Sequence, residues 1–122
     1  MVVPGPKTDQ KLVRYASRRL YGDLLKAGVR IFEYRPGMIH VKMLIVDDLW
    51  SVVGTTNFDN RSFEHNDEVN LVARDAATAR RLSEDHERDI TNSREITLRM
   101  WKRRPLVEKL VGSVVWMLER QQ

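Results

Sequence analysis

One stretch of this chain combines the pattern of a buried strand with polar side chains that such a strand ordinarily avoids. It runs from His40 to Asp47, follows a Pro36-Gly37 turn and contains five apolar residues. Successive side chains of an extended chain point to opposite faces, so His40 and Lys42 project to the same side, whereas Asp47 has the opposite parity near the strand's end. A neutral imidazole can attack phosphorus, and an ammonium can hold negative charge on the non-bridging oxygens. The stretch therefore predicts a site for displacement at a phosphate group.

A polar segment, Gly54-Thr55-Thr56-Asn57, follows this stretch and offers further ligands for a phosphate. Asn57 can donate its side-chain amide and Thr55 its hydroxyl, although both residue types also close turns, and Asn57 is the stronger candidate. Arg61 either meets the substrate phosphate or anchors the loop through carboxylates, and the sequence leaves both open. Asp47 is interpreted as a residue that holds the geometry and does not transfer protons.

The spacing of these residues is similar to that of a known family. The pattern H-x-K-x4-D-x6-G-T-x-N resembles the signature of the phospholipase D superfamily, the HKD motif; here it is formed by His40, Lys42, Asp47, Gly54, Thr55 and Asn57. The similarity continues through N-F-D-N-R-S at 57–62 and N-D-E-V-N at 66–70, which resemble the bacterial cardiolipin synthase branch. Several fixed positions in order are far less probable by chance than one short pattern.

The resemblance implies a two-step mechanism. His40 attacks a phosphodiester to give a phosphohistidine while a second histidine protonates the leaving alkoxide, and this second histidine then deprotonates the incoming alcohol or water. Glu68 is implied to orient His40 by accepting its other ring proton. The superfamily site is built from two such motifs, and this chain carries one. The second motif is expected from an N-terminal half, which the abrupt start of the chain favours, or from an identical chain across an isologous interface.

The implied activity is phosphatidyl transfer between phosphatidylglycerol molecules with release of glycerol. An anionic phospholipid is then the substrate, and the protein is expected to lie peripherally at the bacterial cytoplasmic membrane. The resemblance implies no metal and no cofactor, and His65, Asp67 and Glu68 are expected to be solvated loop residues. One rival is a homodimeric single-motif phosphodiesterase or nuclease, for which strongly salt-dependent DNA binding would speak. Another is a catalytically silent lipid-binding half, which would bind anionic vesicles unchanged after His40→Ala.

The excess positive charge of the chain lies in its C-terminal part. The net charge is +4, residues 1–93 hold 14 charges of each sign, and residues 94–122 hold seven positive charges against three negative. A uniformly basic surface that tracks nucleic acid is therefore not expected, and nucleic acid is an unlikely partner. We expect a catalytic half over 1–93 and a basic amphipathic tail over 94–122. This tail either anchors to anionic lipid or packs on the domain, and the composition does not choose.

The periodicity predicts an α/β fold, a mixed β-sheet flanked by helices, corresponding to a partial domain: most of the C-terminal half of a phospholipase D-like enzyme. The chain has no cysteine for a disulfide framework and no apolar stretch of membrane-spanning length. The first expected elements are a strand end at 2–3 and a helix that is capped by Thr8, has an apolar stripe of Leu12, Ala16, Leu20 and Leu24, and stops at Gly28. Strands are expected at 29–34, 39–46, 51–54 and 68–74. A helix capped by Asp75, an apolar connection over 96–101 and a final helix from Pro105 are expected after them.

Overall fold

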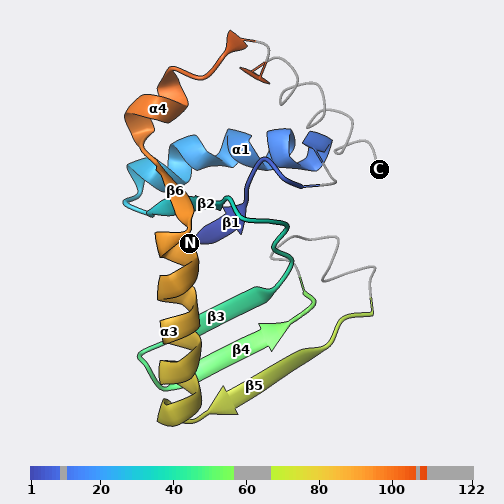
Figure 1. Ribbon diagram of the computed structural model, residues 1–122, viewed down its shortest axis with the longest axis vertical. Coiled ribbons are helices and arrows are strands. Elements are labelled where there is room, and N and C mark those ends of the chain that lie inside the picture. The colour runs from blue at the N-terminus through green and yellow to red at the C-terminus, as the bar shows by residue number, and fades with distance from the viewer. Residues whose placement is uncertain (9–10, 57–66, 107, 110–122) are drawn as a thin grey trace. The chain divides into compact units, whose positions relative to one another are not determined.

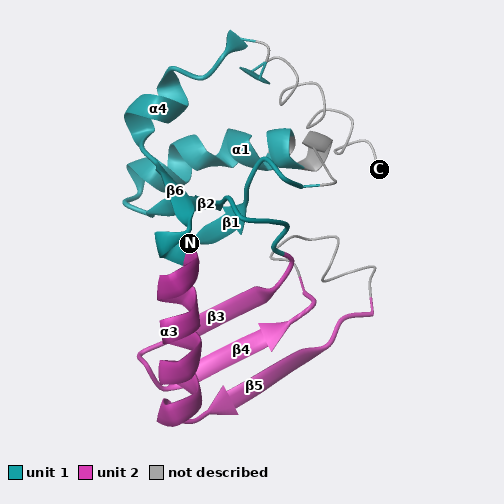
Figure 2. Ribbon diagram, in the orientation of Figure 1, with its two compact units in different colours: residues 1–39, 90–122 teal, residues 40–89 magenta. Residues whose placement is uncertain are grey.

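The structure is a computed structural model, and it describes residues 1–8, 11–56, 67–106 and 108–109. The described strands form two three-stranded sheets accompanied by helices, so the predicted α/β class is confirmed. The chain divides into two compact units, unit 1 with residues 1–39 and 90–122 and unit 2 with residues 40–89 (Figure 2). In chain order the elements are β1 (Val2–Pro4), α1 (Lys11–Lys26), β2 (Ile31–Tyr34), β3 (Lys42–Val46), β4 (Trp50–Gly54), β5 (Asn70–Arg74), α3 (Ala76–Thr91), β6 (Ser93–Ile96) and α4 (Leu98–Lys102) (Figure 1).

Unit 1 is built on a mixed sheet in the order β1-β2-β6. Strand β1 runs parallel to β2, and β6 runs antiparallel to it. Tyr21, Ile31 and Ile96 are buried in its core, against partly buried side chains that include Met100 and Trp101. The apolar connection expected over 96–101 is instead the end of β6 followed by helix α4, because Ile96 pairs with Ile31 in the sheet. Residues 94–96 were expected in the C-terminal tail, but they are part of this sheet.

Helix α1 ends as predicted but turns a different face inward. Gly28 has φ +88°, the amide of Val29 donates to the carbonyl of Leu24 at 3.0 Å, and the amide of Gly28 donates to the carbonyl of Leu25 at 3.2 Å, which is a Schellman cap. Leu20 is 59% exposed, whereas its neighbour Tyr21 is 3% exposed, so the expected apolar stripe is wrong at Leu20. Leu24 packs against the core as expected. The side chains of Leu12 and Ala16 lie outside the described part of the chain.

The expected stripe fails because the inward face of α1 also carries charge. Arg14 and Arg18, on the same side of the helix as Tyr21, both bind the buried carboxylate of Glu33 on β2. A helix face can therefore be buried through ion pairs and an aromatic ring as well as through leucines. Leucine spacing alone could not identify that face.

Unit 2 contains the antiparallel sheet β3-β4-β5 and helix α3. Strands β3 and β4 form the predicted hairpin, with Asp47 and Asp48 at its turn at φ 54° and 50° and the amide of Leu49 donating to the carbonyl of Val46 at 3.2 Å. Asp residues tolerate such left-handed conformations better than most side chains. The Asp75 cap is also confirmed, because its Oδ2 accepts hydrogen bonds at 2.7 Å from both the amide and the hydroxyl three residues further along.

Two strands of unit 2 are shorter than the sequence predicts. Strand β3 begins at Lys42 and not at residue 39, because β4 ends at Gly54 opposite Lys42 and leaves His40 without a strand partner. Strand β5 begins at Asn70, which pairs with Gly54, and not at Glu68. Within the residues described, no helix has both the length and the apolar character needed to cross a bilayer.

Candidate active site

The motif histidine and lysine meet in unit 2. Lys42 is the first residue of β3 and His40 precedes the strand by two residues, and the Lys42 Nζ to His40 Nε2 distance is 2.9 Å. An ammonium group only donates hydrogen bonds, so Nε2 is the acceptor, which assigns the ring proton to Nδ1. Nδ1 has no hydrogen-bond partner among the described residues. His40 is exposed, and its Nε2 lone pair is held by the Lys42 ammonium group until another acceptor takes that hydrogen bond.

Three residues in register form a row across the sheet beside this pair. Lys42 of β3 pairs with Gly54 of β4, which pairs with Asn70 of β5. A Cβ on Gly54 would lie 2.0 Å from Asn70 Oδ1 and 2.4 Å from the carbonyl oxygen of Val69, so only glycine allows this approach. The row therefore places Lys42 and Asn70 on the two strands that flank Gly54 in the middle strand.

Thr55 and Thr56, which follow β4, are hydrogen-bonded to Val69 and Asn70 at the start of β5. The amide of Thr55 donates to the carbonyl of Val69 at 3.0 Å, and the amide of Val69 donates to Thr55 Oγ1 at 3.0 Å. The Asn70 amide donates to Thr56 Oγ1 at 2.7 Å. These bonds hold Thr56 at the edge of the row. Because the Thr55 hydroxyl already accepts from the backbone, its part in binding substrate stays a prediction.

The other predicted site residues are placed less directly. Asp47 lies in the β3–β4 hairpin turn, where its positive φ fits the expected role of holding geometry. Glu68 is partly buried next to Val69, and no hydrogen bond links it to His40 within the described residues, so its orienting role stays a prediction. Asn57 and Arg61 lie outside the described residues.

Sequence reasoning missed the supporting pair Asn70 and Thr56. Both lie inside the segments that carry the family resemblance, but an asparagine at the start of a strand and a threonine after one are common in turns. The signal that identifies this pair is Gly54, which has no side chain at the point where the Asn70 side chain lies against it. Among the described residues, no three His, Asp or Glu side chains gather closely enough to hold a metal ion.

An apolar surface continues from the row along the same side of the sheet. Its next positions are Leu44, Val52 and Val72, paired across the three strands, followed by Val46 and Trp50. Leu44, Val46, Trp50 and Val72 are between 42% and 58% exposed. Contiguous exposed apolar side chains of this kind mark interaction surfaces more often than isolated ones do.

Comparisons with known proteins agree with the motif. The family model described as "Cardiolipin synthase, PLD-like domain" matches residues 1–90. Cardiolipin synthase 2 of Bacillus anthracis is 40% identical over 112 residues, which are 92% of this chain and 22% of that protein. Cardiolipin synthase 1 of Staphylococcus aureus (strain COL) is 43% identical over 108 residues, 88% of this chain and 22% of that protein. The chain thus spans about a fifth of the length of these relatives.

The fold has a counterpart among solved structures. The crystal structure of Nuc from Salmonella typhimurium, a phospholipase D family member, superposes with a TM-score of 0.57 at 20% identity, covering 61% of this chain and 50% of that one. At this identity the likeness concerns the fold. With the histidine–lysine pair in place and residues 1–90 matched, the chain belongs to the family of cardiolipin synthase phospholipase D-like domains.

Proposed function

We propose that this chain supplies one histidine–lysine half of the active site of a cardiolipin synthase-type phosphatidyltransferase. The observation that carries the proposal is the 2.9 Å contact between Lys42 Nζ and His40 Nε2. It holds the nucleophilic nitrogen and the cation that would bind the phosphate oxygens within one hydrogen bond of each other. Family membership and the 40% identity to a cardiolipin synthase over 92% of the chain support the choice of reaction.

In the first step, a non-bridging oxygen of phosphatidylglycerol replaces the imidazole as the acceptor of the Lys42 hydrogen bond. His40 Nε2, released from the ammonium, attacks phosphorus; the N–P bond forms as the P–O bond to glycerol breaks. The glycerol oxygen takes its proton from a second histidine, outside this chain's single motif. Lys42 stabilises the charge that builds on the non-bridging oxygens, and Asn57 is proposed to donate to them as well.

In the second step, the same second histidine removes the proton from a glycerol hydroxyl of another phosphatidylglycerol. That oxygen attacks the phosphohistidine, the N–P bond breaks, and His40 returns to its starting form. Glu68 is proposed to accept a hydrogen bond from the Nδ1–H of His40 and so to direct Nε2 at phosphorus, and Arg61 to bind substrate phosphate or anchor the loop. Asp47 is proposed to keep the hairpin turn in place.

The second motif is proposed to come from an N-terminal half of the enzyme. The sequence holds one motif, and the apolar surface beside the Lys42–Gly54–Asn70 row supports a partner that covers it. The chain by itself is then inactive or nearly so, because half of the acid–base pair is absent. The substrate is an anionic phospholipid, and the protein is proposed to work at the bacterial cytoplasmic membrane, with the basic part over 94–122 as one candidate contact.

The test is phosphatidyl trapping on the purified chain, with its mass in solution measured alongside. Wild type, His40→Ala and Lys42→Ala are mixed with labelled phosphatidylglycerol, with and without the N-terminal segment of a relative. Label that is stable in alkali and lost in acid identifies a phosphohistidine. His86→Ala, which changes a partly buried histidine of α3, is the matched control and should leave trapping unchanged.

We expect trapping in wild type with the added segment, its loss in His40→Ala, and a strong reduction in Lys42→Ala. Turnover by a proven monomer without the segment would contradict the half-site proposal. Turnover by a dimer would instead indicate the homodimeric phosphodiesterase. Vesicle binding unchanged by His40→Ala, with no trapping under any condition, would indicate a silent lipid-binding half.

A further inference from the structure

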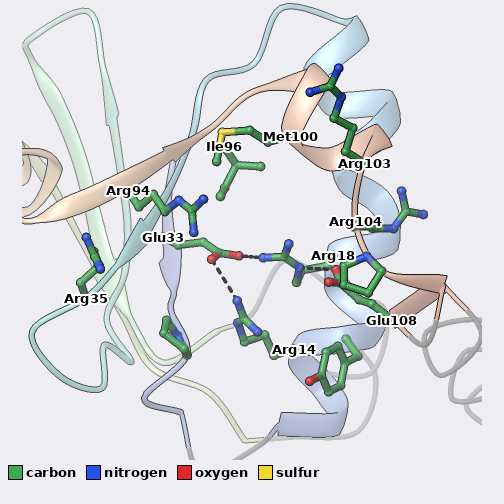
Figure 3. A pocket seen from close by; sticks show the side chains of 13 residues that line it. Arg14, Arg18, Glu33, Arg35, Arg94, Ile96, Met100, Arg103, Arg104 and Glu108 are labelled. Carbon is green, nitrogen blue, oxygen red and sulfur yellow. Dashed lines mark hydrogen bonds and ion pairs between the residues drawn. The ribbon is translucent and has the colours of Figure 1, made fainter.

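A pocket in unit 1 is lined mainly by arginines. It encloses about 400 Å³ between α1, β2, β6 and the segment after α4 (Figure 3). Within the described residues its lining holds six arginines against two glutamates. The arginines are Arg14, Arg18, Arg35, Arg94, Arg103 and Arg104, and the glutamates are Glu33 and Glu108.

Two of the arginines are fixed by the glutamates. Arg14 Nη2 lies 2.9 Å from Glu33 Oε2, Arg18 binds the other oxygen of Glu33, and Arg18 Nε lies 2.6 Å from Glu108 Oε1. These side chains are between 6% and 17% exposed. Arg14 Nε is buried and has no hydrogen-bond partner. The glutamates therefore neutralise and orient two guanidinium groups but leave a buried donor unused, which costs free energy.

The remaining arginines form no ion pair with a carboxylate within the described residues. Among the described residues, none forms an ion pair with Arg35, Arg94 or Arg103, while Arg104 lies 3.8 Å from the ring centre of Trp101. Arg94 is the register partner of Glu33 on the neighbouring strand, so both side chains leave the sheet on the same side, as Figure 3 shows. The lining thus carries four more positive than negative charges.

The phenol of Tyr21, next to Arg18, does not reduce this excess. The guanidinium of Arg18 lies 5.6 Å from the ring centre of Tyr21. Burial, and after it the negative charge of Glu33, raise the pKa of Tyr21 well above its usual value. The phenol of Tyr21 therefore stays neutral at physiological pH and adds no negative charge beside Arg18.

We propose that this pocket binds a phosphate group, either on a phospholipid head group or on a free phosphate ester. Guanidinium forks match phosphate oxygens, and helix α1, the residue after β2, strand β6 and the segment after α4 all contribute arginines to the lining. A bound phosphate would accept from guanidinium groups that form no ion pair among the described residues and would offset the repulsion among the outer arginines. The proposal does not rest on the function of His40, because every lining residue belongs to unit 1.

The test compares arginines inside and outside the pocket. Inorganic phosphate is titrated calorimetrically into the 122-residue chain at constant ionic strength, for wild type, Arg94→Ala, Arg103→Ala, Arg99→Ala and His40→Ala. In the part of the chain that the structure describes, neither Arg94 nor Arg103 forms an ion pair, so both variants should keep the wild-type circular dichroism spectrum. Arg99→Ala is the matched control, since it removes the same charge from an exposed position of α4 outside the pocket.

We expect Arg94→Ala and Arg103→Ala to weaken phosphate binding by about tenfold each, the value of one charge-assisted hydrogen bond, with Arg99→Ala unchanged. The binding that these two substitutions weaken should remain in His40→Ala. Equal weakening by Arg99→Ala would mean unspecific attraction and would overturn the proposal. Loss of binding in His40→Ala alone would place the phosphate at the motif and would also overturn it.

A second arm identifies the source of the phosphate. The same variants are sedimented with phosphatidylcholine vesicles that contain or lack phosphatidylglycerol, and glycerol 1-phosphate is titrated in parallel. Vesicle binding that falls in Arg94→Ala but not in Arg99→Ala assigns a lipid head group. Binding of glycerol 1-phosphate with no vesicle binding assigns a free ester. Absence of binding in both arms and in the phosphate titration refutes the site.

Discussion

Glu33→Gln tests whether the buried carboxylate of unit 1 holds its arginines in place. The change keeps the shape of the side chain and removes the charge that Arg14 and Arg18 share. Breaking a buried ion pair from one side typically costs 3–5 kcal/mol. Arg18 keeps Glu108, whereas Arg14 loses the one carboxylate that pairs with it among the described residues, and we expect a loss near the lower end, about 3 kcal/mol.

For a protein of this size, such a loss corresponds to a fall in melting temperature of roughly 12 °C. The assay is urea and thermal unfolding followed by circular dichroism. Glu95→Gln is the matched control because Glu95 lies on the adjacent strand β6 and pairs with Arg30, whose side chain is 70% exposed. Solvent screens that exposed pair, so the control should show no measurable change.

Glu33→Gln should strengthen phosphate binding although it lowers the stability of the fold. Without the Glu33 charge, Arg14 and Arg18 become available to an added anion, so phosphate should bind Glu33→Gln more tightly than wild type and restore part of the lost stability. If Glu33→Gln and Glu95→Gln unfold alike, the buried-pair argument is wrong. If Glu33→Gln binds phosphate more weakly than wild type, the carboxylate is not a competitor of the anion, and the account of the pocket fails.

Three further substitutions test individual contacts. Gly54→Ala would force a Cβ to within 2.0 Å of Asn70 Oδ1, so we expect a loss of about 1–3 kcal/mol in urea unfolding together with loss of phosphatidyl trapping; unchanged trapping would contradict the supporting row. Gly22→Ala gains about 1 kcal/mol of helix propensity but places its Cβ 2.4 Å from the Trp101 ring, so we expect net destabilisation. The double variant Gly22→Ala/Trp101→Leu should unfold at a higher urea concentration than Gly22→Ala alone. Hydrogen bonds from the hydroxyl and amide three residues on lower the pKa of Asp75, so its contribution to stability is present at neutral pH and is lost as the pH falls through that lowered value. The difference in melting temperature between wild type and Asp75→Asn should therefore shrink on acidification, and a constant difference would rule this out.

Features that depend on neighbouring residues could be predicted from the sequence. The hairpin of β3 and β4, the α1 stop at Gly28 and the α3 cap at Asp75 each rest on contacts within a few residues. The meeting of His40 and Lys42 is of the same kind, because two positions separated by one residue lie on one side of an extended chain. The family motif could also be recognised from the sequence, because its fixed spacing reflects the local geometry of the chain.

The strand limits depended on partners further away. His40 was expected inside a strand, but a strand extends only as far as its neighbour, and β4 ends opposite Lys42. The role of Asn70 likewise depends on Gly54, sixteen residues earlier in the chain, which leaves room for its side chain. No pattern within either segment contains this information.

The sequence by itself determined the local features of this protein: a histidine and a lysine at fixed spacing, local turns and caps, and the charge excess near the C-terminus. Only the tertiary structure decided which face of α1 is buried and which charges gather. Glu33 meets Arg14 and Arg18 from 19 and 15 residues away, and Glu108 meets Arg18 from 90 residues away. Such contacts arise when whole elements pack, because burial makes each charge require a partner that adjacent residues cannot supply.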